Sequence, residues 1–380
     1  MFLFFYVCLS LVLILLVTRS KVEFSFAAIF TLALALRTIV LLVFLTSRSE
    51  DINSFIQVGQ MVLDKEAEYG SFYFPFISYL SALVLKLKNY IHPIFSLKLI
   101  FIFFDSLVTY PIYLLSGKNK TSALIYALNP ASVIVTVIHG QMDSIPLFFF
   151  LLALAFFVKN KLSASILTLS LAIFTKPWPI LFILPLFKRA KNKLLFIFLP
   201  LFPLAFTVIY SIFYRVEIKE MLNMIKGYRG VFGAWGISKI ALYLTDYNLS
   251  PAIEQLLRRV FLIGFIVFSY LRSDKKVIVT IVLSMLFLFV FSPTFGMQWF
   301  SWIVPLVIIV RPKLWKIFLV MVSVYLASGF AWDAYRYVKE MMTFWNSVIN
   351  RIGFLFWIFI IIMFYRNVFY QTTQGNKNRR

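Results

Sequence analysis

Asp51 is the residue of this sequence that we expect to act as a catalytic base. It lies in a polar stretch, residues 47–76, between two strongly apolar regions. This stretch holds five of the fifteen acidic residues: Glu50, Asp51, Asp64, Glu66 and Glu68. Because the preceding apolar run ends near Leu45, the carboxylate of Asp51 is expected where hydrocarbon meets water. A carboxylate in that position can accept the proton of an attacking hydroxyl group.

A second concentration of polar groups follows the apolar run that ends at Ile138. It brings an imidazole, an amide, a carboxylate and a hydroxyl close together around Gly140: His139, Gln141, Asp143 and Ser144. Such groups can hold a substrate and stabilise charge beside a base. The simpler interpretation is a hydrophilic turn in which Asp143 caps the next helix. The residues alone leave both interpretations open.

Lys176 and Asp105 are ionisable residues in apolar surroundings. Lys176 precedes Pro177 and Pro179, whose freed backbone groups require a polar cavity in a membrane protein, and an ammonium there is a natural partner for phosphate. Its alternative is to extend to the membrane surface. Asp105 lies midway along an apolar run at a cost of about 2.5–3.5 kcal/mol, which makes it a functional candidate. Its alternative is a hydrogen bond to a Ser, Thr or Tyr of a neighbouring helix.

Three further polar residues complete the set of candidates. Asn53 follows Asp51 by two positions. Arg229 lies in a long polar segment, residues 214–250, and is a candidate partner for a phosphate group. Gln298 lies at the boundary of an apolar run, where an aromatic belt explains the neighbouring tryptophans but not the amide.

The composition places these candidates in a membrane protein. Hydrophobic residues make up 62% of the chain and charged residues 14%, whereas soluble proteins carry roughly 25% charged residues. The net charge of +22 is divided among small basic clusters between apolar runs, as at Lys118, Lys188 and Arg311. This pattern is typical of cytoplasmic loops and not of a nucleic-acid-binding face. No polar interval is long enough to fold alone, so residues 1–380 are expected to form one integral domain.

The apolar runs predict an all-α bundle of about thirteen transmembrane helices, since a span needs roughly 20 residues and fewer where a helix is broken or shielded. They lie near 2–17, 24–46, 96–115, 121–138, 144–158, 161–174, 177–187, 194–213, 252–271, 277–291, 298–310, 314–331 and 351–365. With the basic clusters in the cytoplasm, Asp51, His139 and Lys176 fall on the extracytoplasmic side of a multi-pass cell-membrane protein, and the C-terminus is cytoplasmic.

Two helices are expected on the surface of the first outer loop. Apolar side chains between Phe55 and Val62 share one helix face opposite polar ones, which predicts an amphipathic helix in the membrane interface. Residues 74–90 are expected to form a second helix that lies on the surface or re-enters the membrane. The sequence has no Gly-rich phosphate loop and no Cys/His metal spacing, and its only histidines are His92 and His139. A histidine metal centre is therefore not expected, and a divalent metal held by carboxylates stays an open alternative.

The order of these parts resembles the GT-C fold of glycosyltransferases that use polyprenyl-phosphate sugars. The most specific elements are the Gly-Gln-x-Asp-Ser turn that begins at Gly140 and the Lys-Pro-x-Pro element at Lys176. The chain is most similar to archaeal and bacterial membrane mannosyltransferases and to the first mannosyltransferase of GPI-anchor assembly, over roughly residues 24–306. The resemblance places the family's first-loop carboxylate at Asp51. Where GPI-type enzymes have Asp-x-Asp, this chain has Asn53 as the second residue, which argues against dependence on a divalent metal.

The resemblance implies a hexosyltransferase that works with inversion on the extracytoplasmic face. Its donor would be a polyprenyl (dolichyl) phosphate sugar, most commonly mannose in the family, and its acceptor a lipid-linked glycan, a glycolipid or a protein. A competing hypothesis is a transporter or flippase of lipid-linked sugars with Asp105 and Asp143 as coupling sites. An inactive assembly subunit is a third. Because the polar residues gather on one side and not at mid-membrane, the enzyme is favoured.

Overall fold

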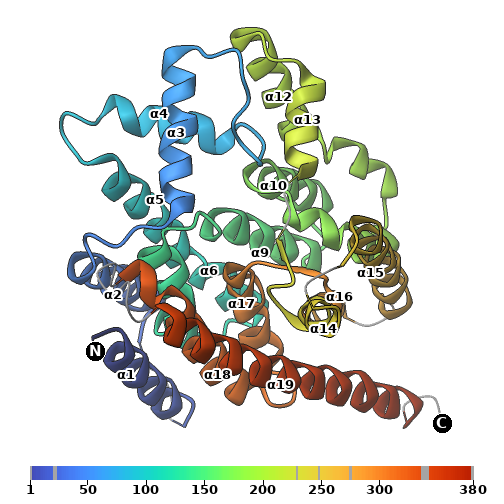
Figure 1. Cartoon of the computed structure of the whole chain (residues 1–380). Helices are drawn as coiled ribbons and strands as arrows, with labels where there is room; N and C mark the ends of the chain where they lie inside the picture. The colour runs from blue at the N-terminus through green and yellow to red at the C-terminus, as the bar shows by residue number, and fades with distance from the viewer. Residues whose placement is uncertain are drawn as a thin grey trace. The chain divides into compact units, whose positions relative to one another are not determined.

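The computed structural model describes residues 2–19, 24–227, 230–246, 249–273, 276–334 and 342–377, and these are helical almost throughout (Figure 1). The chain divides into two compact units. The first comprises Met1–Ile183, Ala190–Tyr228 and Phe330–Arg336. The second comprises Leu184–Arg189, Arg229–Gly329 and Tyr337–Arg380.

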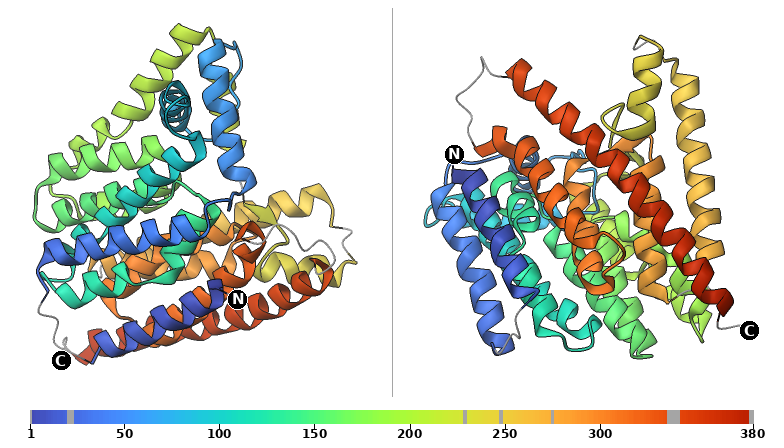
Figure 2. Two further views of the ribbon diagram at one scale, coloured as in Figure 1. Left: turned by 90° about the vertical axis from the view of Figure 1, so that its left-hand side faces the viewer. Right: turned by 90° about the horizontal axis from the view of Figure 1, so that it is seen from below.

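All the regular elements in the described part of the first unit are helices. Its elements are α1 (Phe2–Val17), α2 (Phe26–Val43), α3 (Glu50–Asp64), α4 (Phe76–Lys86), α5 (Pro93–Leu107), α6 (Thr109–Leu115), α7 (Lys120–Ala127), α8 (Pro130–Val133), a π-helix (Ile134–His139), α9 (Ser144–Val158), α10 (Leu162–Thr175), a 3-10 helix (Trp178–Phe182), a 3-10 helix (Lys193–Phe198), α12 (Leu201–Tyr214) and α13 (Ile218–Gly227). Helices α9 and α10 run side by side (Figure 2), and Ser165 on α10 donates a hydrogen bond to the carbonyl of Ala153 on α9.

In its described part, the second unit is helical apart from one short strand pair. Its elements are α11 (Ile183–Arg189, whose first residue belongs to the first unit), β1 (Val231–Phe232), α14 (Gly236–Leu244), α15 (Pro251–Arg272), α16 (Val277–Phe291), β2 (Thr294–Phe295), a 3-10 helix (Met297–Trp299), α17 (Phe300–Val310), α18 (Trp315–Ala334) and α19 (Met342–Lys377). The strands pair antiparallel with Val231 opposite Phe295. The last residues of α18, from Phe330, belong to the first unit.

The helices have the length and apolar character of a helical membrane protein, but fewer of them than expected reach full spanning length. Among the described residues, four do: Phe26–Val43, Pro93–Leu115, Lys193–Tyr214 and Val348–Phe369. A bent pair, Lys120–Ala127 and Pro130–His139, forms a fifth if its two helices, which meet at 44°, are taken as one span. The shorter apolar helices of the described residues have 10–17 residues, with α18 counted from Trp315 to Ala331, which is short of the roughly 20 that a bilayer requires.

Prolines account for one of the departures from the expected spans. The expected span 177–187 is a single 3-10 turn followed by the short helix α11. Pro179 and Pro185 lie within this segment, and a proline removes a backbone donor and clashes with the preceding turn. The expected span 194–213 is present as Lys193–Tyr214, one of the four full-length helices, although it begins as a 3-10 helix and α12 starts only after Pro200.

The amphipathic helix expected in the first loop is present as α3. Ser49 caps it by accepting a hydrogen bond from the amide of Ile52, and Lys65 ends it in the left-handed region at φ 56°. The apolar face of α3 packs on α4 and α5 instead of facing lipid: Phe55, for example, lies edge-on to Phe101 of α5. The expected second surface helix, over residues 74–90, is α4, which packs along α3.

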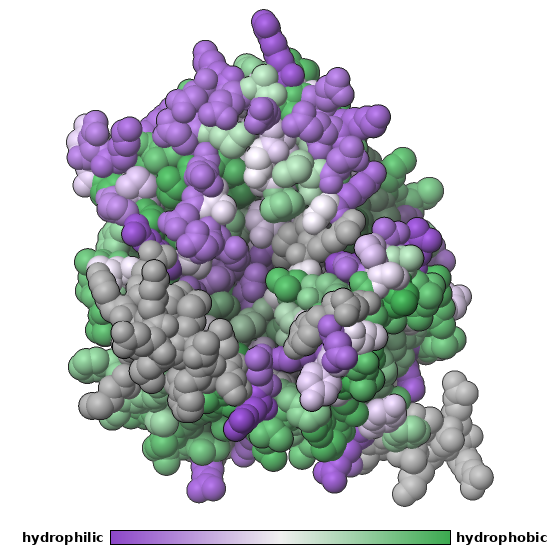
Figure 3. All heavy atoms as spheres, in the orientation of Figure 1, coloured by the Kyte–Doolittle hydropathy of each residue, from purple (hydrophilic) through white to green (hydrophobic). Residues whose placement is uncertain are grey.

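The surface of the first unit differs between its helices. Large apolar side chains are exposed along α1 and α2, including Phe5, Ile39 and Leu42, as is appropriate for lipid contact. Hydrophilic side chains gather instead over α3 and α13 (Figure 3). The polar side of the first unit is therefore the side that carries α3, which begins at Glu50 and Asp51.

Candidate functional site

Asp51 lies in the first turn of α3, where two side chains from the polar turn after Ile138 donate to its carboxylate. Nε2 of Gln141 lies 2.5 Å from Oδ2 of Asp51, and Nε2 of His139 lies 3.2 Å from the same oxygen. The Asp51 side chain remains 40% exposed. The structure thus brings together two polar stretches, residues 47–76 and the turn after Ile138, that were expected on the same side of the membrane. It also leaves the Asp51 carboxylate accessible to an incoming molecule.

The polar turn has an unusual backbone that projects these donors toward α3. Helix α8 starts at Pro130, and the Asn129 side chain accepts from the amide of Ala131. The helix then widens into the π-helix Ile134–His139, a form of helix that frequently marks functional sites. The chain leaves this helix at Gly140, and the amide of Gln141 donates back to the carbonyl of Val135 at 3.0 Å.

Gly140 allows the turn to approach α3 closely. Its φ of +78° is in the left-handed region that favours glycine. A Cβ at this position would lie 2.9 Å from Cδ1 of Ile52 and 3.1 Å from Cε of Lys98. Lys98 in turn donates from Nζ to the carbonyl and the hydroxyl of Ser47, just ahead of α3. The entry to α3 is therefore fixed to α5 and to the polar turn by buried contacts.

His139 is held from its other side by a residue that the sequence analysis did not select. Its Nδ1 lies 2.7 Å from Oδ2 of Asp333 near the end of α18, and its ring stacks on Phe330 with centroids 4.1 Å apart. Asp51 and Asp333 thus contact opposite nitrogens of one imidazole. With a carboxylate on each nitrogen, the ring is held in position, and in its protonated form it donates one N–H to each carboxylate.

Lys176 and Asp143 form a buried ion pair behind Asp51. Nζ of Lys176 lies 2.9 Å from Oδ1 of Asp143, with side chains 0% and 2% exposed. The same ammonium lies 5.0 Å from the centre of the Tyr73 ring. The interpretation that Lys176 extends to the membrane surface is therefore wrong. Asp143 does occupy the N-cap position of α9, but its side chain makes no capping hydrogen bond and pairs with Lys176 instead.

The electrostatic environment keeps Asp51 ionised. Burial acts to raise the pKa of Asp51, but the hydrogen bond and charge of His139, the charge of Lys176 and the hydrogen bond from Gln141 together hold that pKa below its ordinary value of 3.8. The charged form is therefore the stable one at neutral pH. An ionised, partly exposed carboxylate with fixed donors behind it can take a proton from a bound hydroxyl group.

A groove runs from Asp51 along the exposed face of α3. Its volume is about 560 Å³, and its other wall is the chain between Glu66 and Tyr73. The lining residues are Asp51, Ser54, Phe55, Gln57, Val58, Gln60, Met61, Glu66, Gly70, Ser71, Phe72 and Tyr73. Asp51 therefore contributes both to the hydrogen-bonded cluster and to an open binding surface.

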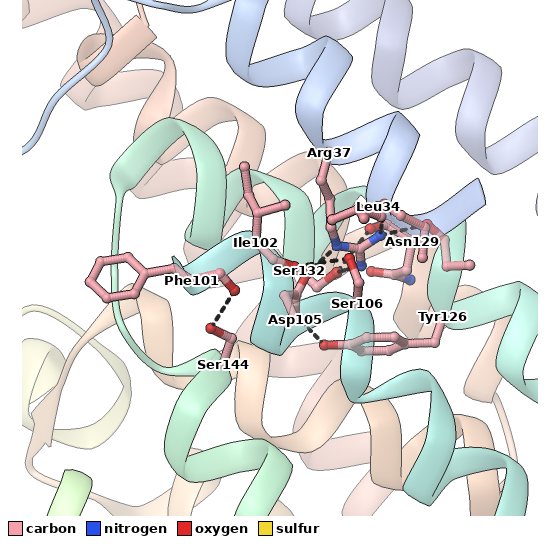
Figure 4. Close-up of polar contacts among 12 residues, drawn as sticks. Leu34, Arg37, Phe101, Ile102, Asp105, Ser106, Tyr126, Asn129, Ser132 and Ser144 are labelled. Atoms are coloured by element: carbon pink, nitrogen blue, oxygen red, sulfur yellow. Dashed lines mark hydrogen bonds and ion pairs between the residues drawn. The ribbon is translucent and has the colours of Figure 1, made fainter. Parts of the chain in front are cut away.

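Asp105 belongs to a separate, fully buried cluster (Figure 4). Its Oδ2 accepts from Nε of Arg37 at 2.5 Å and its Oδ1 from the Tyr126 hydroxyl at 2.6 Å. Arg37 also donates to the carbonyls of Ala33 and Ala127 and to the hydroxyl of Ser132. The expected packing hydrogen bond to a hydroxyl is therefore present, and an arginine on α2 that the sequence analysis did not select completes the cluster.

No contact among the described residues joins the remaining candidates to Asp51. Asn53 is half-buried on α3. Gln298 belongs to the second unit, where its carbonyl accepts from the Ser301 hydroxyl. Arg229 lies outside the described residues. Within the described ranges, no three His, Cys, Asp or Glu side chains are grouped so as to hold a metal ion.

Comparison with known proteins returns no significant match to this chain, whether with protein-family models, with curated proteins or with solved structures. The fold and the site define a nearly all-α protein whose long apolar helices are those of a membrane protein. Its candidate site consists of an ionised carboxylate, an imidazole held between two carboxylates and a polar groove.

Proposed function

We propose that this protein is a membrane glycosyltransferase with a GT-C-like bundle. It transfers a hexose, of which mannose is the family's commonest, from a polyprenyl (dolichyl) phosphate carrier to an acceptor hydroxyl on the extracytoplasmic face, with inversion. The C-terminus is cytoplasmic in this proposal. The acceptor is a lipid-linked glycan, a glycolipid or a protein, and nucleic acid has no part in the reaction.

The observation that carries the proposal is the state of Asp51. Its carboxylate receives hydrogen bonds from His139 and Gln141 and opens into a groove. Inverting transfer needs one base near the acceptor oxygen and no covalent intermediate. A carboxylate that stays ionised and partly exposed meets that requirement, and the exposed apolar helices α1 and α2 provide a surface for a lipid-linked donor.

The proposed reaction forms one bond and breaks one. The acceptor oxygen attacks the anomeric carbon of the donor sugar, and the bond from that carbon to the phosphate oxygen breaks. The electron pair of this bond stays on the phosphate oxygen, so the leaving group is polyprenyl phosphate. The hydroxyl proton passes to Asp51. His139 and Gln141 hold the Asp51 carboxylate in position, and Asp333 holds the other nitrogen of His139.

The leaving phosphate needs positive charge or hydrogen-bond donors. Of the residues that the sequence suggested for this role, Lys176 pairs with Asp143, and both His139 and Gln141 contact Asp51. In the proposed mechanism Lys176 therefore binds the carboxylate of Asp143, and His139 and Gln141 bind that of Asp51. None of the three contacts the phosphate. Arg229 stays the sequence-based candidate for the phosphate.

The transporter hypothesis has one observation in its favour. Two ion pairs, Arg37 with Asp105 and Lys176 with Asp143, are buried among apolar helices, and intramembrane ionisable residues often couple transport to ions. A transporter, however, requires two compartments, whereas a transferase does not. The two functions can therefore be separated by removing the membrane barrier.

The test is sugar transfer by the purified protein in detergent micelles. A synthetic polyprenyl-phosphate mannose serves as donor, and alkyl glycosides together with a lipid extract of the expression host serve as acceptors. The proposal predicts formation of an elongated product and of free polyprenyl phosphate in equal amounts. Sugar-lipid movement in sealed proteoliposomes without any transfer in micelles would support the transporter instead.

A further inference from the structure

The groove along α3 has the size and construction of a binding site. Its volume of about 560 Å³ is within the range of about 300–1,000 Å³ that is usual for ligand pockets. The exposed polar side chains of α3 form one wall and the chain from Glu66 to Tyr73 forms the other. From Asp51 to Gln60 the helix rises by about 14 Å, at 1.5 Å per residue, so an elongated ligand fits better than a compact one.

The second wall of the groove is fixed by the first unit itself. The hydroxyl of Tyr69 donates to the carbonyl of Tyr73, and the Ser71 hydroxyl accepts from the amide of Tyr73. The amide of Tyr69 donates to Glu220 of α13 at 3.2 Å. Gly70 lies so close to α3 that a Cβ there would be 2.7 Å from Sδ of Met61. The shape of the groove is therefore set before any ligand binds.

Neutral polar groups and aromatic rings dominate the lining. Ser54, Gln57 and Gln60 project from α3 into solvent, and hydroxyl and amide groups can both donate and accept hydrogen bonds. Phe72 is 50% exposed at the opposite wall. A flat apolar ring beside hydroxyls and amides suits a pyranose, which presents C–H groups on its faces and hydroxyls around its edge.

The charges of the groove exclude the donor phosphate from it. The charged residues in the lining are Asp51 and Glu66, and none of its described residues is Lys or Arg. Two carboxylates disfavour a bound anion. A polyprenyl chain is equally unsuited, because the exposed side of α3 carries serine and glutamine. The groove therefore fits a neutral, hydroxyl-rich ligand.

We propose that this groove is the acceptor subsite and that it binds a neutral oligosaccharide, with the reacting sugar beside Asp51 and the preceding sugars along α3 toward Gln60. This inference rests on the proposed glycosyltransferase function. It narrows the acceptor to one with a neutral glycan chain, as opposed to a peptide or an anionic headgroup. Phe72 and Gln57 then determine which acceptor binds, and Asp51 carries out the chemistry.

Protection of an engineered cysteine tests binding without requiring transfer. In a Cys8→Ser background, which removes the single native thiol, Ser54→Cys places a thiol in the groove with little change in shape. Lys88→Cys, which is exposed beyond α4 and outside the groove, is the matched control. The labelling rate with a polar maleimide is measured in micelles with α-mannotriose, maltotriose, inorganic phosphate or an acetylated serine tripeptide.

The inference predicts that at least one neutral trisaccharide slows labelling at Ser54→Cys threefold or more and leaves Lys88→Cys unchanged. Phe72→Ala, which removes the ring that is 50% exposed at the groove wall, weakens this protection. Phosphate and the tripeptide have no effect. If neither trisaccharide protects at saturating concentration, or if phosphate or the tripeptide protects as well as the sugar, the inference is wrong.

The same variants separate this inference from the proposed function. Asp51→Asn in the Ser54→Cys background should lose transfer and keep protection. Asp51-dependent transfer without any protection would overturn the acceptor groove and leave the transferase intact. Protection without transfer by the unmodified protein would instead identify a carbohydrate-binding protein and overturn the transferase.

Discussion

Nζ of Lys176 lies 2.9 Å from a carboxylate oxygen of Asp143, and neither side chain is more than 2% exposed. This pair joins the start of α9 to the end of α10, directly behind the groove. It also places a positive charge close enough to Asp51 to lower the pKa of that carboxyl. One ion pair therefore acts on both the packing and the chemistry of the first unit.

Breaking this pair should destabilise the protein strongly. Lys176→Met leaves the Asp143 carboxylate buried without its cation, and removal of one partner of a buried pair costs about 3–5 kcal/mol. We expect a large fall in the thermal unfolding temperature in detergent, and Lys176→Met combined with Asp143→Asn should recover part of it. The control is Glu254→Gln, which breaks the partly exposed pair with Arg258 on α15 at a cost of about 0.5 kcal/mol or less. Equal effects of the two single changes would contradict the structural role.

The pH dependence of transfer should report the environment of Asp51. The base must be ionised, and its pKa is held below 3.8, so activity persists at mildly acidic pH and falls only as pH drops through that low pKa. His139→Gln removes a charge and changes a donor at the carboxylate while burial continues to favour the neutral acid. The acidic limb of the pH–rate profile should therefore move to higher pH. An unchanged or lower limb would show that His139 does not control the ionisation of Asp51.

The Arg37 cluster should be structural. Asp105→Asn leaves the Arg37 guanidinium buried without its counter-ion, and we expect a loss of about 3–5 kcal/mol measured as a lower unfolding temperature. The transfer rate per folded molecule should stay near that of the unmodified protein, because the cluster's hydrogen bonds join α2, α5, α7 and α8 without reaching Asp51. A stable Asp105→Asn variant that has lost function would assign Asp105 to the chemistry or to ion coupling.

Gly59 should be intolerant of even a methyl group. A Cβ there would lie 2.5 Å from Cβ of Ser81 and 2.7 Å from its backbone carbonyl carbon, so Gly59→Ala forces α3 away from α4. Overpacking of this kind costs about 1–3 kcal/mol, and unfolding of the purified variant measures it. Gly264→Ala on α15 is the control, since its Cβ meets only Phe287 at 3.6 Å and alanine favours a helix by up to about 1 kcal/mol. A more stable Gly59→Ala variant would contradict the close α3–α4 contact.

Local patterns predicted several of these features. The change from apolar to polar residues at Asp51, and the polar turn around Gly140, indicated two segments of like character on one side of the membrane, and the described contacts join them. The amphipathic period of α3 was equally clear. The pattern did not show what the apolar face of α3 packs against. A helix face that suits a membrane interface has the same pattern as one that packs on neighbouring helices.

The parts that could not be predicted depend on long-range pairing. His139 and Asp333 are 194 positions apart, and the only local signal for Asp333 was that it is one of fifteen acidic residues. Arg37 was not selected because the average hydropathy of its helix is high. A lone arginine at mid-span nevertheless requires a buried partner, and so does a lone aspartate such as Asp105. The expected span 177–187 was overestimated because Pro179 and Pro185 divide an apolar run that composition alone joins.

The central claim is that the Asp51 carboxylate accepts the proton of the acceptor hydroxyl. The most direct measurement is the rate of mannose transfer from synthetic polyprenyl-phosphate mannose by Asp51→Asn. Glu50→Gln, which alters the exposed neighbouring carboxylate, serves as the matched control. We predict that Asp51→Asn folds normally and loses transfer by about 100-fold or more, the contribution expected of a general base, while Glu50→Gln stays near the unmodified rate. Transfer by Asp51→Asn at the unmodified rate would contradict the claim.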